Sequence, residues 1–236
     1  EIAFKGVEYV YHCAALISFD PSDEKTLRKT NIEGTANVVN FCLAYQVKKL
    51  CYVSSIAALG DLKASEMIVT EETEWNPELV HSDYAISKYG AEMEVWRGQQ
   101  EGLSVTVVNP GVILGPGFWD SGSGLLFTQI AKGLPFYTKG TSGFVAVTDV
   151  VKSMIQSMES ENSGSRFIVV AENISYETIV KTIADGLCVK APCFYAKPWM
   201  TEIYWRIESL LGFLIGKKRA LSKTTARTIH QTDLYS

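Results

Sequence analysis

Short apolar runs rich in β-branched and aromatic residues alternate with longer stretches of helical periodicity along the first half of the chain. The apolar runs cover residues 7–12, 49–54 and 105–109. Between them, the spacing of apolar positions predicts helices over 24–46 and 83–101. Strands separated by helices of this length are joined by right-handed crossovers, so we predict a mostly parallel sheet.

The pattern becomes shorter and less regular after residue 115. Here the sequence predicts a helix over 125–132, a strand over 165–171, and helices over 175–187 and 199–216. The predicted fold class is therefore α/β, with a Rossmann-like doubly wound parallel sheet formed mainly by residues 1–115. A small C-terminal α/β substrate lobe would be formed mainly by residues 116–236, and some of its segments would return to the sheet.

Composition limits the functional classes. The 236 residues are 47% apolar and carry a formal charge of -4, with a sequence pI near 5.5, so a sizeable core can form and the basic surface of a nucleic-acid binder is missing. The five cysteines form no CxxC pair, which is typical of a reducing compartment, and the three histidines lack the spacing of metal ligands. We expect a cytoplasmic protein with a small-molecule substrate, no metal and no nucleic-acid partner.

No signal peptide and no membrane span are evident in the sequence. The nearest candidate is the apolar stretch 199–215, but Glu202, Arg206 and Glu208 interrupt it and three basic residues follow at 217–219. We favour an amphipathic helix packed against the protein. The alternative is a helix that lies on a membrane surface, as basic flanks allow.

Tyr84 and Lys88 are four residues apart on a predicted helix, so their side chains leave the same face. A phenol is a poor acid or base near neutral pH because its pKa is about 10, but a nearby ammonium group favours the phenolate. We expect Lys88 to lower the pKa of Tyr84 in this way. The alternative is an exposed lysine beside a half-buried tyrosine.

Ser55 ends a predicted strand, at the rim where parallel sheets place their functional groups. Its hydroxyl can donate to the same substrate oxygen that Tyr84 protonates, so Ser55, Tyr84 and Lys88 would form one proton-handling site. The alternative is that the Ser54-Ser55 step only ends the strand and caps the next turn.

Several segments resemble, in the same order, the landmarks of the extended short-chain dehydrogenase/reductase family. They are 6–15 (GVEYVYHCAA), 31–35 (NIEGT), 53–55 (VSS) with a glycine at 60, 83–88 (DYAISK), 109–117 (NPGVILGPG) and 144–150 (FVAVTDV). The resemblance covers nearly the whole chain and implies a nicotinamide-dependent oxidoreductase. The Asn-Pro-Gly segment is more similar to the dihydroflavonol reductase branch, because many sugar-nucleotide epimerases carry Arg where this chain has Asn109.

The resemblance also implies roles for individual residues. The implied catalytic residues are Ser55, Tyr84, Lys88 and Asn31. The implied cofactor-binding residues are His12, Ala14, Ala15, Val53, Ser54, Tyr84, Lys88, Pro110, Gly111 and Val112. Three aromatic residues, Phe118, Trp119 and Phe144, are candidates to line an apolar substrate pocket, although lid packing is an equal alternative. The runner-up functions are a sugar-nucleotide epimerase or dehydratase with tightly bound NAD, and a non-catalytic dinucleotide sensor or scaffold.

The Gly-rich turn that receives the cofactor pyrophosphate in this family does not occur in the sequence. Either roughly the first two strand–helix units are missing from the chain, or the chain is a degenerate member. We favour the first interpretation, because a parallel sheet that began at residue 7 would expose a broad apolar edge. The residue that selects NAD or NADP belongs to that same part, so only the family favours NADP. The family further implies a homodimer formed through the predicted helices 24–46 and 83–101.

Overall fold

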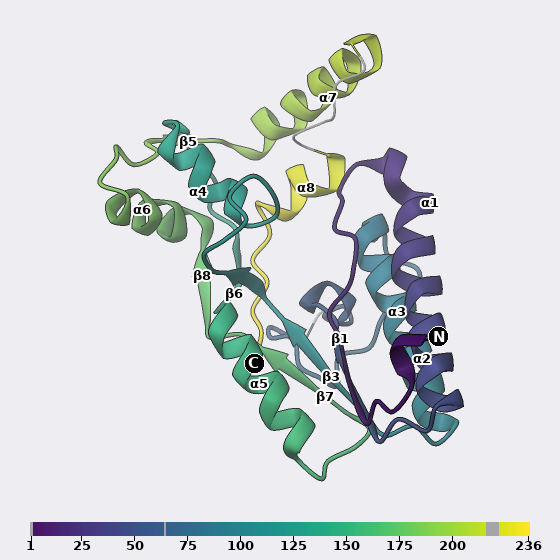
Figure 1. The fold of residues 1–236 in the computed structure, drawn as a ribbon. Coiled ribbons are helices and arrows are strands. Elements are labelled where there is room, and N and C mark those ends of the chain that lie inside the picture. Colours follow the sequence, from purple (N-terminus) through teal and green to yellow (C-terminus); the bar gives the residue numbers. More distant parts are fainter. Residues whose placement is uncertain (1, 64, 216–221) are drawn as a thin grey trace.

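The computed structural model describes residues 2–63, 65–215 and 222–236, and its centre is a parallel sheet of four strands (Figure 1). The strands are β1 (Tyr9–His12), β2 (Lys49–Val53), β3 (Val105–Pro110) and β7 (Ser165–Val169). They lie side by side in the order β1-β2-β3-β7, and each neighbouring pair is parallel. The predicted α/β class and parallel sheet are confirmed.

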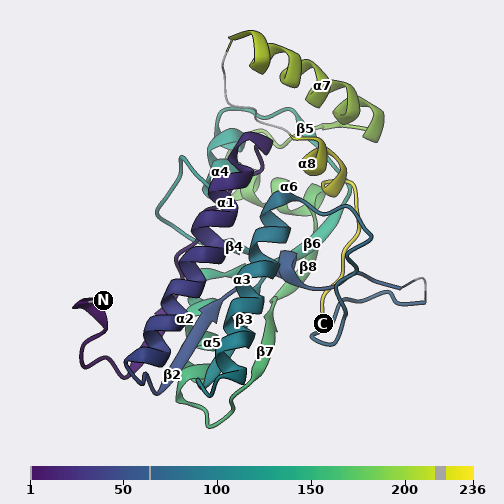
Figure 2. The ribbon, with the colours of Figure 1, turned by 90° about the vertical axis from the view of Figure 1, so that its right-hand side faces the viewer.

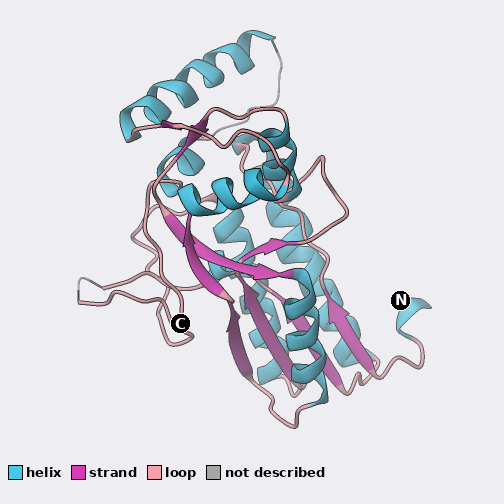
Figure 3. Ribbon diagram, turned by 90° about the vertical axis from the view of Figure 1, so that its left-hand side faces the viewer, coloured by secondary structure: helices cyan, strands magenta, loops and turns pink. Residues whose placement is uncertain are grey.

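Helices cover both faces of this sheet (Figures 1 and 3). One face carries α1 (Glu24–Leu27), α2 (Gly34–Ala44) and α3 (Asp83–Gln100), and the other carries α5 (Val147–Glu159). The helix predicted over 24–46 is one helical stretch whose middle, Arg28–Glu33, is a π-helical turn. Three short 3-10 turns, Ile2–Phe4, Pro21–Asp23 and Ile56–Ala58, complete this half.

The core follows from burial on both faces. Successive residues of β2 point to opposite sides, so Leu50 and Tyr52 pack under α2 and α3, whereas Cys51 packs under α5. The first cluster also contains Val39, Cys42, Ala91, Val95, Val105 and Val107, and the second contains Val108, Val145, Val150 and Met154. This double cover explains why the strands of the sequence are continuous apolar runs rather than alternating ones.

A second lobe extends from the carboxyl ends of the strands (Figure 1). Its sheet has the order β4-β6-β8, with β4 parallel and β8 antiparallel to β6. Its elements are β4 (Val112–Leu114), α4 (Gly124–Ala131), β5 (Phe136–Tyr137), β6 (Thr141–Ala146), β8 (Glu172–Ser175), α6 (Tyr176–Gly186) and β9 (Phe194–Tyr195). Between β6 and β8 the chain returns to the main sheet, where it forms α5 and β7.

Helix α7 (Pro198–Ile215) projects from the second lobe and contacts α8 (Lys223–Thr228) (Figure 2). We expected a helix packed by its apolar face, but four large apolar side chains of α7 are about half exposed, namely Trp199, Ile203, Tyr204 and Ile207. The predicted helix end at Gly216 and the basic residues 217–219 lie outside the described residues. In the part of the chain that the structure describes, no helix combines the length and apolar character needed to cross a membrane.

Lys49 is a buried cation that joins the main sheet to α5. Its Nζ donates to the carbonyl oxygens of Ser157 (2.6 Å) and Ser160 (2.7 Å), at the C-terminal end of α5. The last carbonyls of a helix lack partners within the helix and carry the negative end of its dipole. Lys49 therefore anchors the end of α5 to the first residue of β2.

We predict that Lys49→Met lowers the free energy of unfolding by about 1–3 kcal/mol, because the aliphatic stem stays but two buried carbonyls lose their donor. Urea unfolding of the wild type and the variant measures this. The matched control is Lys48→Met, whose exposed ammonium pairs with Glu8 and should change stability by no more than about 0.5 kcal/mol. Equal losses in both variants would contradict the anchor.

Candidate active site

The hydroxyls of Ser55 and Tyr84 meet at the carboxyl end of β2. Ser55 is the second residue after β2, and its Oγ accepts from the backbone N of Ala57 (3.1 Å). Tyr84 stands in the first turn of α3, a helix that begins where the Ser82 side chain caps the backbone N of Ala85 (3.1 Å). The Ser55 hydroxyl hydrogen-bonds the Tyr84 side chain and lowers its pKa, but burial has the larger effect, so the pKa of Tyr84 is raised.

Lys88 lies one turn further along α3 and is 1% exposed. Its Nζ donates to the Tyr52 hydroxyl (2.9 Å) and to the carbonyl oxygen of Val53 (2.9 Å). Burial lowers the pKa of Lys88 to about 8, although the charge of Glu92 opposes this shift. The sequence predicted that Lys88 lowers the pKa of Tyr84. The structure differs, because the ammonium takes its acceptors from β2 and burial dominates the pKa of Tyr84.

Behind Lys88, a chain of hydrogen bonds crosses the interior. The Tyr52 hydroxyl interacts with the Thr35 side chain, and Thr35 Oγ1 lies 2.9 Å from His12 Nε2. Burial lowers the pKa of His12 to about 4, so the ring is neutral near pH 7 and its Nε2 can accept from Thr35. His12, predicted as a cofactor residue, is therefore also connected to Lys88 through Thr35 and Tyr52.

Asn31 ties three segments together from the π-helical turn. Its Oδ1 accepts from the backbone N of Leu16 (2.7 Å), and its Nδ2 donates to the Leu16 carbonyl (2.9 Å) and to Ser87 Oγ (2.9 Å). Turns of this type are often found at functional sites because they shift one residue out of helical register. Asn31 thus fixes the loop after β1 against α3, next to Lys88.

Glu92 is a site residue that the sequence analysis missed. It is fully buried, and four donors surround its carboxylate. Its Oε2 accepts from Ser54 Oγ (2.6 Å) and Asn109 Nδ2 (3.0 Å), and its Oε1 accepts from Trp96 Nε1 (3.2 Å) and pairs with Arg166 (3.3 Å).

A sequence signal for Glu92 existed. Tyr84, Lys88 and Glu92 are spaced four apart, so all three share one face of α3. Nothing local marks Asn109 or Arg166 as its partners, because these residues come from other strands. Asn109 is fully buried, and the same Nδ2 that bonds Glu92 also donates to the carbonyl of Ser55 (3.0 Å).

The loop between Ser55 and Tyr84 is held by an aromatic stack. Trp75 stacks on His81, with ring centroids 3.8 Å apart, and on Tyr89 of α3, with centroids 4.4 Å apart. His81 also lies 3.5 Å from Asp61. Phe19, on the loop after β1, contacts the Tyr84 ring edge-on at 5.6 Å.

The remaining predicted cofactor residues follow the strand ends. Ala14 and Ala15 are exposed in the loop after β1. Pro110 ends β3, and Val112 begins β4. Gly111 between them packs against the second lobe, where a Cβ atom would lie 2.4 Å from the Gly143 carbonyl oxygen. Only glycine allows this approach of the two lobes.

The three predicted substrate residues do not form one pocket wall. Phe144 is 3% exposed and belongs to the core of the second lobe, where its ring meets Tyr176 edge-on. Side chains of α4 and α6, among them Ile130 and Ile179, pack in the same cluster and explain this burial. Phe118 is 87% exposed, and Trp119 is half exposed with its ring against Phe127.

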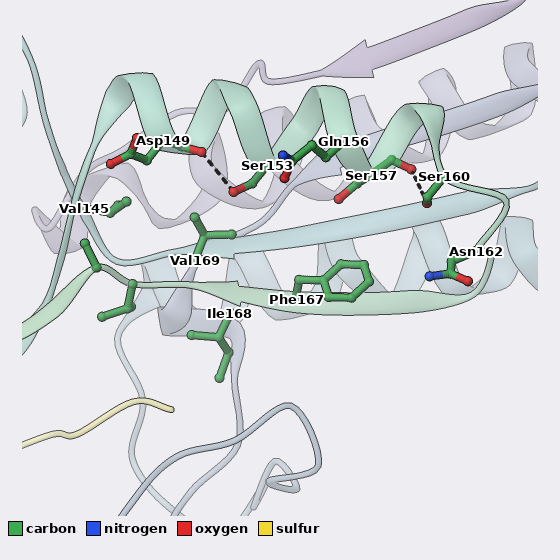
Figure 4. Close-up of a pocket in the computed structure, with 12 residues that line it drawn as sticks. Val145, Asp149, Ser153, Gln156, Ser157, Ser160, Asn162, Phe167, Ile168 and Val169 are labelled. Atoms are coloured by element: carbon green, nitrogen blue, oxygen red, sulfur yellow. Dashed lines mark hydrogen bonds between the residues drawn. The ribbon is translucent and has the colours of Figure 1, made fainter.

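A separate hollow lies between α5 and β7, on the face of the sheet opposite α3 (Figure 4). Asp149, Ser153 and Gln156 of α5 line one side, and Phe167 and Ile168 of β7 line the other. None of the predicted site residues lines this hollow.

Comparison with known proteins identifies the family. Residues 1–161 match the model of the NAD-binding family described as male sterility protein. The chain belongs to this family. It is a member of the extended short-chain dehydrogenase/reductase group that the sequence resembles, and it has the Rossmann-like fold of that group.

Curated relatives include reductases and an epimerase. The chain is 26% identical to a putative dihydroflavonol 4-reductase of Synechocystis sp. (88% of this chain, 62% of the relative) and 30% identical to anthocyanidin reductase of Arabidopsis thaliana (81% and 62%). It is 24% identical to UDP-glucose 4-epimerase of Vibrio cholerae (95% and 69%). The crystal structure of gox2253 superimposes with a TM-score of 0.81 at 28% identity (100% and 72%). The chain thus spans about three fifths of the length of the two reductases.

The residues present fit the ribose and nicotinamide end of such a cofactor. Lys88 uses two of its three N–H donors, and Ser55 and Tyr84 offer hydroxyls at the same rim. Within the described residues, the buried Oδ1 of Asn109 has no hydrogen-bond partner. Ribose hydroxyls and a carboxamide are the groups that such a set of donors and acceptors can hold.

We predict that acid destabilises the protein through His12. Its folded pKa of about 4 lies below the unfolded value of 6.5, so between these values the unfolded chain binds one more proton and stability falls as pH falls. The full shift corresponds to about 3 kcal/mol. Urea unfolding at pH 4 and pH 7 should therefore show a smaller loss for His12→Asn than for the wild type. The same loss in both proteins would show that the histidine is not the group responsible.

Proposed function

We propose that the protein is an NAD(P)-dependent oxidoreductase that reduces or oxidises a carbonyl or alcohol carbon of a small molecule through Ser55, Tyr84 and Lys88. The observation that carries the proposal is the hydrogen bond between Ser55 and Tyr84 beside a buried lysine. When bound, the nicotinamide supplies or accepts the hydride. The similarity to the two reductases supports an alcohol or ketone substrate, and we favour NADP as the cofactor.

The three residues have distinct roles in this proposal. Tyr84 gives a proton to the substrate oxygen in reduction and takes it back in oxidation. Ser55 donates a hydrogen bond to the same oxygen and keeps it facing the phenol. Lys88 holds ribose hydroxyls, and its positive charge stabilises the phenolate that remains after proton transfer. The raised pKa of Tyr84 favours the protonated phenol, which is the form needed for reduction.

We predict that Tyr84→Phe lowers kcat on the order of 10²- to 10⁴-fold, because general acid catalysis is lost while the ring and its packing stay. The measurement is oxidation of NADPH with a panel of aromatic and aliphatic aldehydes and ketones, together with thermal unfolding to confirm the fold. Tyr45→Phe, at the far end of α2, is the control and should keep wild-type activity. Near-full turnover of Tyr84→Phe with any accepted substrate would reject the assignment.

The second candidate is a sugar-nucleotide epimerase or dehydratase, which the similarity to UDP-glucose 4-epimerase favours. Such a protein keeps NAD through purification and converts a UDP-sugar without consuming added cofactor. Mass spectrometry of the purified protein and a UDP-glucose assay distinguish it from a reductase that consumes NADPH. Binding of cofactor without turnover in either assay would indicate a sensor or scaffold. The homodimer through α1, α2 and α3 stays a prediction, which light scattering tests.

A further inference from the structure

The buried carboxylate of Glu92 connects α3 to β3, to β7 and to the residue that follows β2. Its four donors are Ser54, which follows β2, Asn109 of β3, Arg166 of β7 and Trp96 of α3 itself. The strands β2, β3 and β7 are neighbours in the main sheet, and α3 packs against one of its faces (Figure 2). A fully buried carboxylate is costly unless it is paired and fully hydrogen-bonded. Here both oxygens have two partners each. Displacing any of these elements would leave a buried charge short of a partner, so the carboxylate opposes such movement.

Two of these bonds lead directly to Ser55. Ser54, the residue before Ser55, donates from its Oγ to Glu92 Oε2 (2.6 Å). Asn109 Nδ2 bridges Glu92 and the Ser55 carbonyl, at 3.0 Å to each. The backbone on both sides of the Ser55 α-carbon is therefore fixed relative to α3, which also carries Tyr84.

Arg166 fixes the opposite side of the carboxylate. Its Nη1 pairs with Glu92 (3.3 Å), and its Nε donates to the carbonyl of Glu71 (2.8 Å). The side chain of Glu71 in turn accepts from the backbone N of Ile168 on β7 (2.9 Å). The loop between Ser55 and Tyr84 is thus tied to the edge strand β7, and Arg166 takes part in both this connection and the ion pair with Glu92.

We propose that Glu92 is a positioning residue, whose carboxylate fixes Ser55 relative to Tyr84 and Lys88 through Ser54 and Asn109. This inference rests on the proposed function, because it assigns the role by its effect on the same three residues. Glu92 touches neither Ser55 nor Tyr84 side chains in the described contacts, so it acts through its neighbours. It also shares the α3 face of Lys88, where its negative charge favours the ammonium form.

The charge gives the proposal a second, independent consequence. The titratable groups around Lys88 are Tyr84 and Glu92 on α3, Tyr52 on β2, and His12 and Cys13 at the end of β1. Of these, Glu92 is the carboxylate. Removing the charge of Glu92 lowers the pKa of Lys88 from its value of about 8. Lys88 then loses its proton at a lower pH, so activity that needs the ammonium form declines earlier as the pH is raised.

The test is Glu92→Gln in the complete protein, with Glu94→Gln as the matched control. Glu94 lies on the same helix but pairs with Arg97 at the surface. We expect Glu92→Gln to lower kcat on the order of 10- to 100-fold, as a small misplacement of catalytic groups does, and to change the KM for the cofactor little. The alkaline limb of the pH profile should move down by about 1 pH unit. Glu94→Gln should show neither effect.

Two further measurements keep the outcomes separate. The ¹³Cε resonance of Lys88 in lysine-labelled protein titrates without any assay of activity, and its midpoint should fall in Glu92→Gln. If Glu92→Gln fails to fold, Ser54→Ala is the second variant. It removes only the hydrogen bond from Ser54 to Glu92 and should lower kcat by about tenfold. A folded Glu92→Gln with wild-type kcat, pH profile and Lys88 titration would overturn the inference. Wild-type activity of Tyr84→Phe would instead overturn the proposed function, and the Lys88 titration would still decide whether Glu92 sets the charge of the site.

Discussion

The structure depends on burying two opposite charges, Lys88 and Glu92, between a helix and a parallel sheet. Removing a charge from water costs several kcal/mol unless other groups replace the lost hydration. The protein replaces it with acceptors from β2 for the lysine and with four donors for the carboxylate. Because these partners come from separate strands, the charges can be accommodated only when the whole rim is assembled. Reactive groups next to them are therefore held in one arrangement.

Much of the fold could be predicted from the sequence. The strands β1, β2, β3 and β7 and the helices α3, α4, α6 and α7 fall within a few residues of their predicted ranges, because apolar runs and helical periodicity report burial directly. The region around residues 140–151 gave no such pattern. It contains β6, which borders two strands of a small sheet, and the start of α5, so the period changes within a few residues.

The site was predictable only as far as its parts lie on one element or match a family landmark. Tyr84 and Lys88 share a helix face, and Ser55 ends a strand, so their meeting follows from topology. The partner of Lys88 did not follow, because Tyr52 reaches it across the helix–sheet interface. Phe144 was a candidate for the substrate pocket as an aromatic residue near the predicted site, but the sequence did not reveal that it is 3% exposed in the core of the second lobe. Contacts between side chains on different helices and strands can be identified only from the three-dimensional structure.

The order of the main sheet has a consequence for synthesis. Strand β7 pairs with β3, but β4, α4 and β6 of the second lobe come between them in the chain. As the polypeptide leaves the ribosome, the edge of β3 that pairs with β7 therefore stays unpaired while the first part of the second lobe is synthesised. Such unpaired edges expose apolar surface to other chains. The nascent protein therefore passes through a stage in which β2 and β3 have been made, but Arg166 of β7, the ion-pair partner of Glu92, has not.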